Sequence, residues 1–297
     1  MIDWEKLKIF YNVAEGGSFA QAAARLHIDP SAISRHISSL EDRMGVALFA
    51  RHARGITLTE HGNLLLGTTR TIFADLAMAR AQIMDATHPT QGTLKIAATI
   101  GFGIGWLTPH LHRFSTQNPE VRLILHVSDI PVDLGIHESD VSITTFPSES
   151  ADLICHALSH FPLPIYASRQ YLFKFGIPMQ LSDLDRHRLL TFSDTAMIPS
   201  NNVNWLLTCG TETPRKPYLS INNLFGIAGA VNAGSGIACL PPYIAKGYKN
   251  IVQILPDAPV PQVQFYFSYS RHLKDSQKIQ NLWHVLQKEV QKERLSS

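Results

Sequence analysis

The sequence predicts a mainly helical N-terminal domain, then a long helix, then an α/β domain. Three observations predict this arrangement. Apolar residues recur at helical spacing through much of residues 1–90. A breaker cluster, His88-Pro89-Thr90-Gln91-Gly92, then interrupts the pattern. After it, strand-like and helix-like segments alternate, which implies a mostly parallel sheet with helices on both faces.

The composition is that of a folded, globular chain. Of the 297 residues, 45% are hydrophobic and 17% are charged, which excludes a disordered protein. No apolar run approaches the roughly 18 residues of a membrane span, and the N-terminus lacks the layout of a signal peptide. We therefore expect a cytoplasmic protein with no membrane partner. Residues 1–90 hold nine Lys/Arg and nine Asp/Glu, so any nucleic-acid site must depend on where the charges lie.

Spacing and capping residues predict the first three helices. Apolar residues of the first helix recur at steps of three and four: Trp4, Leu7, Phe10 and Ala14. Ser18 and Gln21 form a capping box that predicts an Ala-rich helix over residues 19 to about 26. Asp29 is a good N-cap and Pro30 suits a first helical position, so a third helix should begin there.

The third helix has two contrasting faces. Its apolar stripe consists of Ile33, Ile37, Leu40 and Met44. The opposite face carries Ser31, Ser34, Arg35 and Ser38. Short hydroxyls beside an arginine suit a surface that enters a DNA major groove, because they hydrogen-bond phosphates and base edges without bulk. An ordinary solvated helix face is the alternative.

An apolar segment and a basic hairpin follow. Val46-Ala47-Leu48-Phe49 must pack on the core, and residues 51–59, with Arg51 and Arg54 near Gly55, predict a small β-hairpin with a basic tip. Helix, capped helix, turn, polar-faced helix and hairpin in this order describe a winged helix-turn-helix.

A long helix should follow from residue 59 to residue 86, about 42 Å at about 1.5 Å per residue. Its apolar stripe comprises Leu65, Ile72, Leu76, Ala79 and Ile83, and it has no partner inside so small a domain. We interpret it as a dimerisation helix; packing against the chain's own C-terminal domain is the alternative. A two-fold dimer would place two recognition helices on two half-sites.

Residues 19–62 resemble the N-terminal signature of LysR-type transcriptional regulators. The match comprises the Ala-rich helix, Ala32-Ile33-Ser34, Leu40-Glu41, Gly45, Leu48-Phe49-x-Arg51 and Leu58-Thr59-x-x-Gly62. The resemblance implies a DNA-binding domain over residues 1–58 and a linker helix over residues 59–88. It also implies DNA contacts from Ser18, Ser31, Ser34, Arg35, Ser38, Arg51 and Arg54. Pro30 stands where many members carry a DNA-contacting glutamine, so operator preference should differ.

The remaining residues predict the α/β domain. We expect strands over residues 93–99, 121–127 and 140–144, and helices over residues 106–117 and near residues 131–137. Gly101, Gly103 and Gly105 lie two apart, which does not meet the dinucleotide-binding pattern. They are better interpreted as flexible backbone donors at a helix N-terminus, a site for an anionic or polar ligand.

Residues 131–143, 166–187 and 231–241 resemble further blocks of the LysR effector domain. The resemblance implies two α/β lobes joined by two crossing strands, as in periplasmic binding proteins. On this basis the domain spans residues 92–297, with the first lobe at 92–163 and 270–297, the second at 164–269, and the crossings near 163–167 and 264–269.

The same resemblance places a small effector between the lobes. The implied contacts are Thr99, Gly101, Phe102, Ser128, Thr144, Thr145 and Asn222. Their neutral donors and acceptors suit a small polar or carboxylate ligand, and turn capping is the alternative for any one of them. Many relatives have an Arg-rich turn where this chain has Thr144-Thr145-Phe146-Pro147, which argues against a strongly anionic effector.

Catalytic and cofactor motifs do not emerge from the sequence. HExxH, GxSxG and clustered Cys/His ligands are missing, so we expect no enzyme, no metal and no cofactor. The three cysteines, Cys155, Cys209 and Cys239, are interpreted as small buried residues, with a redox-sensing thiol as the alternative.

The resemblance implies four partners: double-stranded DNA at a pseudo-palindromic operator, the effector, further copies of the chain in a dimer or tetramer, and RNA polymerase. Two other functions remain open. One is a small-molecule binding protein whose N-terminal domain only oligomerises, and the other is an α/β enzyme with a regulatory tail.

Overall fold

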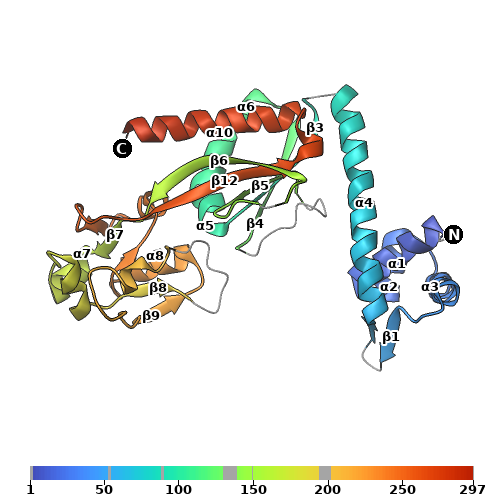
Figure 1. Ribbon diagram of the computed structural model, residues 1–297, viewed down its shortest axis with the longest axis horizontal. Helices are drawn as coiled ribbons and strands as arrows, with labels where there is room; N and C mark the ends of the chain where they lie inside the picture. Colours follow the sequence, from blue (N-terminus) through green and yellow to red (C-terminus); the bar gives the residue numbers. More distant parts are fainter. Residues whose placement is uncertain are drawn as a thin grey trace. The chain divides into compact units, whose positions relative to one another are not determined.

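The computed structural model describes residues 3–52, 55–87, 90–129, 139–148, 150–193 and 202–296. These residues form two compact units, one that ends at Ala81 and one that begins at Gln82. The long helix α4 carries the chain from the first unit into the second (Figure 1).

The first unit has the predicted order of elements. They are α1 (Trp4–Gly16), α2 (Phe19–Leu26), α3 (Pro30–Met44), β1 (Phe49–His52), β2 (Gly55–Leu58) and α4 (Glu60–Thr87), with β1 and β2 antiparallel. The Ser18 hydroxyl accepts a hydrogen bond from the Gln21 backbone N–H at 3.1 Å, and the Asp29 carboxylate accepts one from the Ser31 N–H at 2.8 Å. These caps satisfy donors that have no partner within the helix, and so they determine where α2 and α3 begin.

One apolar core holds the helices and the hairpin together. Its fully buried members include Phe10, Val13, Ile33, Ile37 and Leu48. The ring of Phe49, at the start of the hairpin, lies 5.4 Å from that of Phe10 and 6.1 Å from that of Phe19, centroid to centroid. Each large side chain buried in this way contributes about 1.5–3 kcal/mol. Burial of the apolar stripe of α3 leaves its other face to solvent.

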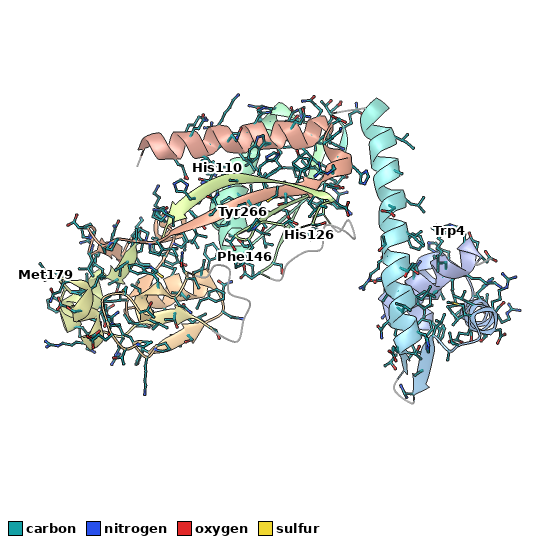
Figure 2. The ribbon with its side chains drawn as sticks, in the orientation of Figure 1. Trp4, His110, His126, Phe146, Met179 and Tyr266 are labelled. Carbon is teal, nitrogen blue, oxygen red and sulfur yellow. The ribbon has the colours of Figure 1, made fainter. Side chains whose placement is uncertain are left out.

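The apolar stripe on α4 divides into two parts. Leu65 is buried and Ile72 packs on the core of the first unit, so the prediction that the whole stripe lacks a partner in this domain is wrong. The reason is that α1 packs against this half of α4, where the rings of Trp4 and Phe73 lie 5.0 Å apart (Figure 2). Farther along, Leu76 is 50% exposed and is available to another surface.

Close backbone contacts join α3, the hairpin and the start of α4. The Glu41 carboxylate accepts hydrogen bonds from the backbone N–H groups of Leu48 at 2.7 Å and Phe49 at 3.1 Å. The Leu48 carbonyl in turn accepts the Thr59 N–H at 2.9 Å. A Cβ on Gly62 would lie 2.1 Å from that same carbonyl oxygen. The first turn of α4 can therefore approach this closely because residue 62 has no side chain.

We expect Gly62→Ala to lower the free energy of unfolding of the first unit by about 1–3 kcal/mol, because the added methyl group overlaps a hydrogen-bonded backbone carbonyl. Gly67→Ala is the matched control on the same helix, since nothing lies within 4 Å of its Cβ position; it should stabilise by about 0.5–1 kcal/mol. Amide hydrogen exchange of α1 and α3 in the full chain measures both. Equal protection in the two variants would contradict the packing argument.

The first lobe of the second unit contains a five-stranded sheet of order β4-β3-β5-β12-β6. Its strands are β3 (Gly92–Ala98), β4 (Val121–Val127), β5 (Val141–Thr144), β6 (Leu153–Pro162) and β12 (Gln262–Ser270). A continuous helical run follows β3: α5 (Ile100–Phe102), a π-helical turn η1 (Gly103–Leu107) and α6 (Thr108–Gln117). After β12 come η5 (Arg271–Leu273) and α10 (Gln277–Ser296), which packs on α6 and β6 (Figure 1). The helix predicted near residues 131–137 lies outside the described residues.

The second lobe holds two small sheets, of order β10-β7-β11 and β8-β9. Its strands are β7 (Ile165–Ser168), β8 (Leu190–Phe192), β9 (Leu219–Ile221), β10 (Ala238–Cys239) and β11 (Ile251–Ile254). Its helices are α7 (Arg169–Phe175), η3 (Leu181–Arg186), η4 (Trp205–Leu207), α8 (Leu224–Asn232) and α9 (Pro242–Ala245).

The chain crosses between the lobes twice. It leaves the first lobe after β6 and returns after β11, and the Leu163 N–H donates to the Pro261 carbonyl at 3.0 Å where the two crossings meet. The second crossing comes earlier than predicted. Residues 262–269, assigned from the sequence to the second lobe, pair with β5 and β6 as part of β12. The correction has a simple cause, since alternating burial identifies a strand without identifying its neighbours.

Candidate functional sites

The polar face of α3 is presented to solvent. Ser31, Arg35 and Ser38 are exposed and Ser34 is partly buried, while Ile33 on the opposite face is fully buried. Hydrogen bonds from the Ser31 hydroxyl and N–H hold the pKa of Asp29 below its ordinary value. An anionic N-cap therefore orders the first turn of the face that would meet DNA.

Of the other predicted DNA contacts, the structure describes the side chain of Ser18 but not those of Arg51 and Arg54. Ser18 caps α2 through its hydroxyl. Arg54 and the side chain of Arg51 lie outside the described residues. The hairpin that carries Arg51 is described, and the His52 imidazole hydrogen-bonds the Thr57 hydroxyl across it at 3.1 Å.

A small cavity lies between the two lobes. It has a volume of about 30 Å³, the space of a single water molecule. The first lobe and the crossings contribute Thr99, Gly101, Phe102, Asp129, Thr145, Phe161, Leu163, Val263 and Phe265, and the second lobe contributes Val203, Leu224, Pro241 and Tyr243. Of the predicted effector contacts, Thr99, Gly101, Phe102 and Thr145 therefore line this cavity.

The remaining predicted contacts are not among the lining residues. The Thr144 hydroxyl donates to the Phe146 carbonyl at 2.8 Å, which is turn capping. The Ser128 N–H donates to the Ala98 carbonyl at 3.0 Å and extends the sheet ladder. Asn222 is exposed, and the next residue, Asn223, instead caps α8.

Asp129 occupies the position at which the sequence predicted a ligand anion. Its carboxylate accepts the backbone N–H of Ile100, the first residue of α5, at 3.0 Å. Burial raises the pKa of Asp129, and the hydrogen bond from Ile100 opposes that shift. The chain's own carboxylate therefore binds the first backbone donor of the segment that the sequence predicted as a site for an anionic or polar ligand.

The glycines of this segment serve close packing. A Cβ on Gly101 would lie 2.9 Å from Leu224 Cδ1, and a Cβ on Gly105 would lie 2.9 Å from Tyr243 Cδ2. Both neighbours belong to the second lobe. The absence of side chains at residues 101 and 105 therefore lets the two lobes approach each other.

Aromatic rings form most of the cavity wall. Phe102 stacks on Phe265 at 4.3 Å between centroids. Tyr243 meets Phe102 edge-on at 6.2 Å and Phe161 at 5.2 Å. Burial and then the charge of Glu293 raise the pKa of Tyr243, so its phenol stays protonated. Sequence reasoning missed Asp129 and Tyr243; an acid directly after a strand end was the available signal for Asp129.

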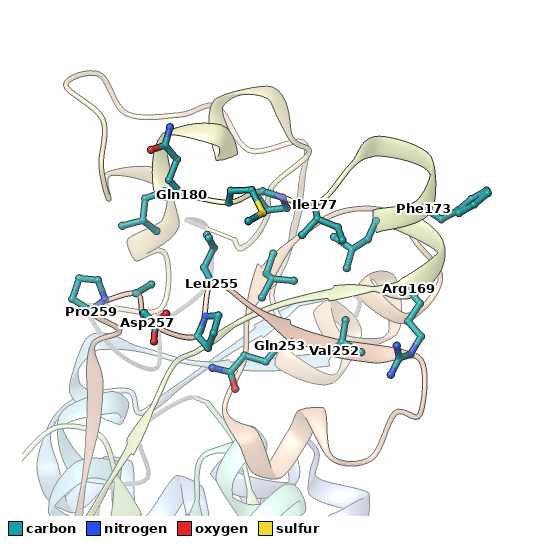
Figure 3. A pocket seen from close by; sticks show the side chains of 16 residues that line it. Arg169, Phe173, Ile177, Gln180, Val252, Gln253, Leu255, Asp257 and Pro259 are labelled. Atoms are coloured by element: carbon teal, nitrogen blue, oxygen red, sulfur yellow. The ribbon is translucent and has the colours of Figure 1, made fainter.

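A larger hollow of about 840 Å³ lies on the second lobe, between the end of α7 and η3 on one side and residues 252–259 on the other (Figure 3). Leu255 in its wall has φ +49°, unusual for a bulky residue. Arg169, Gln180, Gln253 and Asp257 are spread along it. Small-molecule sites usually have a few polar groups that converge, which these four side chains do not do.

Among the residues that the structure describes, no group of three or more His, Cys, Asp and Glu side chains could hold a metal ion. In the same part of the chain, no helix has the length and apolar character to cross a membrane.

Two domain models of one protein family match most of the chain. Residues 4–63 match the bacterial regulatory helix-turn-helix protein, lysR family, and residues 87–291 match the LysR substrate binding domain. The chain belongs to the LysR family of transcriptional regulators. Members of this family are DNA-binding regulators with an effector-binding domain, and they are not enzymes.

Named relatives of this LysR-type regulator are a little over a quarter identical to it over the aligned residues. An HTH-type transcriptional regulator of Xanthomonas campestris pv. campestris is 28% identical over 263 residues, 86% of this chain and 76% of the relative. The regulator CrgA of Neisseria meningitidis serogroup C is 27% identical over 242 residues, 81% of this chain and 80% of the relative.

Solved structures show the same fold. The full-length regulator CbnR, crystallised in complex with its target DNA, has a TM-score of 0.70 at 22% identity, over 97% of this chain and 99% of that chain. Full-length AphB of Vibrio cholerae has a TM-score of 0.63 at 24% identity, over 96% and 98%.

Cys239 of this LysR-type regulator should resist alkylation. Burial raises the pKa of its thiol to about 12, so the reactive thiolate is roughly 10³-fold scarcer at pH 8 than at a free cysteine. We expect iodoacetamide to label Cys239 slowly in the native protein and fast in guanidinium, with peptide mass spectrometry as the measurement and Cys155 as the internal comparison. Labelling at the same rate in both conditions would favour an accessible, redox-competent thiol.

Proposed function

We propose that this regulator binds a pseudo-palindromic operator as a dimer, through the polar face of α3 and the hairpin β1–β2. The observation that carries the proposal is the exposed Ser/Arg face of α3 opposite a fully buried stripe. Such a helix is held from behind by its buried stripe and presents hydroxyls and a guanidinium to solvent, the groups that commonly contact phosphates and base edges. The proposed contacts are Ser18, Ser31, Ser34, Arg35, Ser38, Arg51 and Arg54.

Self-association is proposed to use the second half of α4. Leu76 is 50% exposed in the single chain, and Ala79 is also exposed one turn later. Apolar side chains one turn apart form a surface that a second helix can cover. A two-fold pair of α4 helices would place two copies of α3 on two half-sites of DNA.

Control by a small polar effector between the lobes completes the proposal. The cavity there contains Thr99, Thr145 and Asp129 and is bounded by both lobes, so a bound molecule would alter how the lobes meet. We propose that this change is passed to the operator-bound dimer and to RNA polymerase, in the cytoplasm. The rival function, a solute-binding protein whose N-terminal domain only oligomerises, predicts effector binding without selective DNA binding.

We expect Arg35→Ala to weaken operator binding about 5- to 150-fold, which corresponds to the roughly 1–3 kcal/mol of one lost base contact. A gel shift with the intergenic DNA beside the regulator's own gene measures it over a range of salt concentrations. Arg122→Ala, which removes an exposed arginine from β4, is the matched control and should leave binding unchanged. If the wild type forms no salt-sensitive, sequence-selective complex, the regulator function is lost and the solute-binding rival is favoured.

We expect Leu76→Glu to raise the dimer dissociation constant by at least about 10-fold, because two-fold pairing would bury two carboxylates with no partner. Analytical ultracentrifugation of the full chain measures the change. Leu64→Glu is the control: Leu64 is 74% exposed on the same helix and points about 120° away at about 100° per residue. An equal effect of the two variants would show that α4 does not pair through the proposed face.

A further inference from the structure

One of the polar groups in the wall of the cavity between the lobes is a carboxylate. Asp129 lines the cavity and directs one oxygen, Oδ1, to the Ile100 N–H at 3.0 Å. Helix starts commonly bind ligand anions through such N–H groups. Here the chain's own anion already satisfies the donor, so a ligand carboxylate would have to displace Asp129 or lie beside a like charge.

Over the described ranges, no Lys, Arg or His forms an ion pair with Asp129. Its raised pKa has desolvation as the leading cause, which means that its surroundings stabilise the negative charge poorly. A partly buried carboxylate without a counter-ion gains most from a ligand that brings positive charge.

The rest of the wall suits the body of such a ligand. Phe102, Phe161, Tyr243 and Phe265 line the cavity beside Asp129. Aromatic faces attract cations. Phe102 is stacked between Trp106 and Phe265, so Phe161 and Tyr243, whose ring contacts are tilted or edge-on, are the rings that would offer a face to a cation. The Tyr243 phenol is protonated, so it brings no charge of its own.

We infer that the effector of this regulator is a small organic cation with an aromatic or similarly apolar body, held by Asp129 and the surrounding rings, and that carboxylates are excluded. This inference rests on the proposed function and names the ligand class of the same site. A cationic ligand replaces the small polar or carboxylate ligand that the sequence suggested. The change follows from Asp129, which was not among the effector contacts implied by the sequence.

Binding must also separate the lobes. The cavity of about 30 Å³ is far smaller than the several hundred Å³ of typical ligand sites. The contacts that close it join Tyr243 of the second lobe to Phe102 and Phe161 of the first, with ring centroids 6.2 Å and 5.2 Å apart. A cation that inserts between these rings would move the two lobes apart, so that binding of a positively charged ligand would change the spacing of the lobes.

Three probes of one size and different charge test the inference: benzamidine, benzamide and benzoate, titrated calorimetrically into the full chain. We expect benzamidine to bind in the millimolar range or tighter, and at least about 10-fold more tightly than benzoate, since hydrogen bonds to charged groups carry about 10- to 150-fold in affinity. Asp129→Asn should weaken benzamidine by about 10-fold or more and leave benzamide unchanged. The amide oxygen of that variant can still accept the Ile100 N–H, so the fold should be retained.

Asp257→Asn is the matched control, because Asp257 is the carboxylate that lines the larger hollow of the second lobe. It should leave benzamidine affinity unchanged. The inference is overturned if benzamidine fails to bind, if benzoate binds wild type as tightly as benzamidine does, or if Asp257→Asn rather than Asp129→Asn weakens benzamidine. Gel shifts of the same samples without any probe distinguish the two proposals. Loss of selective DNA binding refutes the proposed function. Intact DNA binding together with a preference for benzoate refutes only the inference that the effector is a cation.

Discussion

The pairing of β12 with β5 and β6 is the constraint on which the effector domain depends. The second lobe lies between β6 and β12 in the sequence. Because β12 pairs with β6, the two crossings between the lobes lie at one place. The hydrogen bond from the Leu163 N–H to the Pro261 carbonyl, at 3.0 Å, joins them there. The second lobe is therefore attached to the first at a single place, through two adjacent crossings.

In the first unit, a comparable constraint acts at the carbonyl of Leu48. Glu41 binds the N–H of Leu48, and Thr59 binds its carbonyl. The side-chain-free surface of Gly62 lets α4 reach the same carbonyl. These contacts position α3, the hairpin and the start of α4 together as one packed group.

The candidate effector site shows how far strand ends can be used for prediction. The family resemblance implied contacts from Thr99 and Thr145, which each follow a strand, and both line the cavity. It also implied Thr144, the last residue of β5, and Asn222, which follows β9; Thr144 caps a local turn and Asn222 is exposed to solvent. Asp129 was not among the predicted contacts, although it directly follows Ser128. The sequence pattern shows where a strand ends, but it does not show which hydrogen-bond donor the next side chain will meet. The first N–H of the α5 run, which comes from elsewhere in the chain, supplies that donor.

The sequence by itself determined the elements of the first unit, their caps and the family, because caps and helical periodicity are local and depend on residues a few positions apart. It also determined that strands and helices alternate in the second unit. Only the tertiary structure decided that β12 belongs to the first lobe, that Leu65 and Ile72 pack within their own domain, and that Gly101 and Gly105 bring the lobes together. Each of these depends on which surfaces meet across long stretches of chain, and a periodic pattern in the sequence marks a buried face without identifying the partner that buries it.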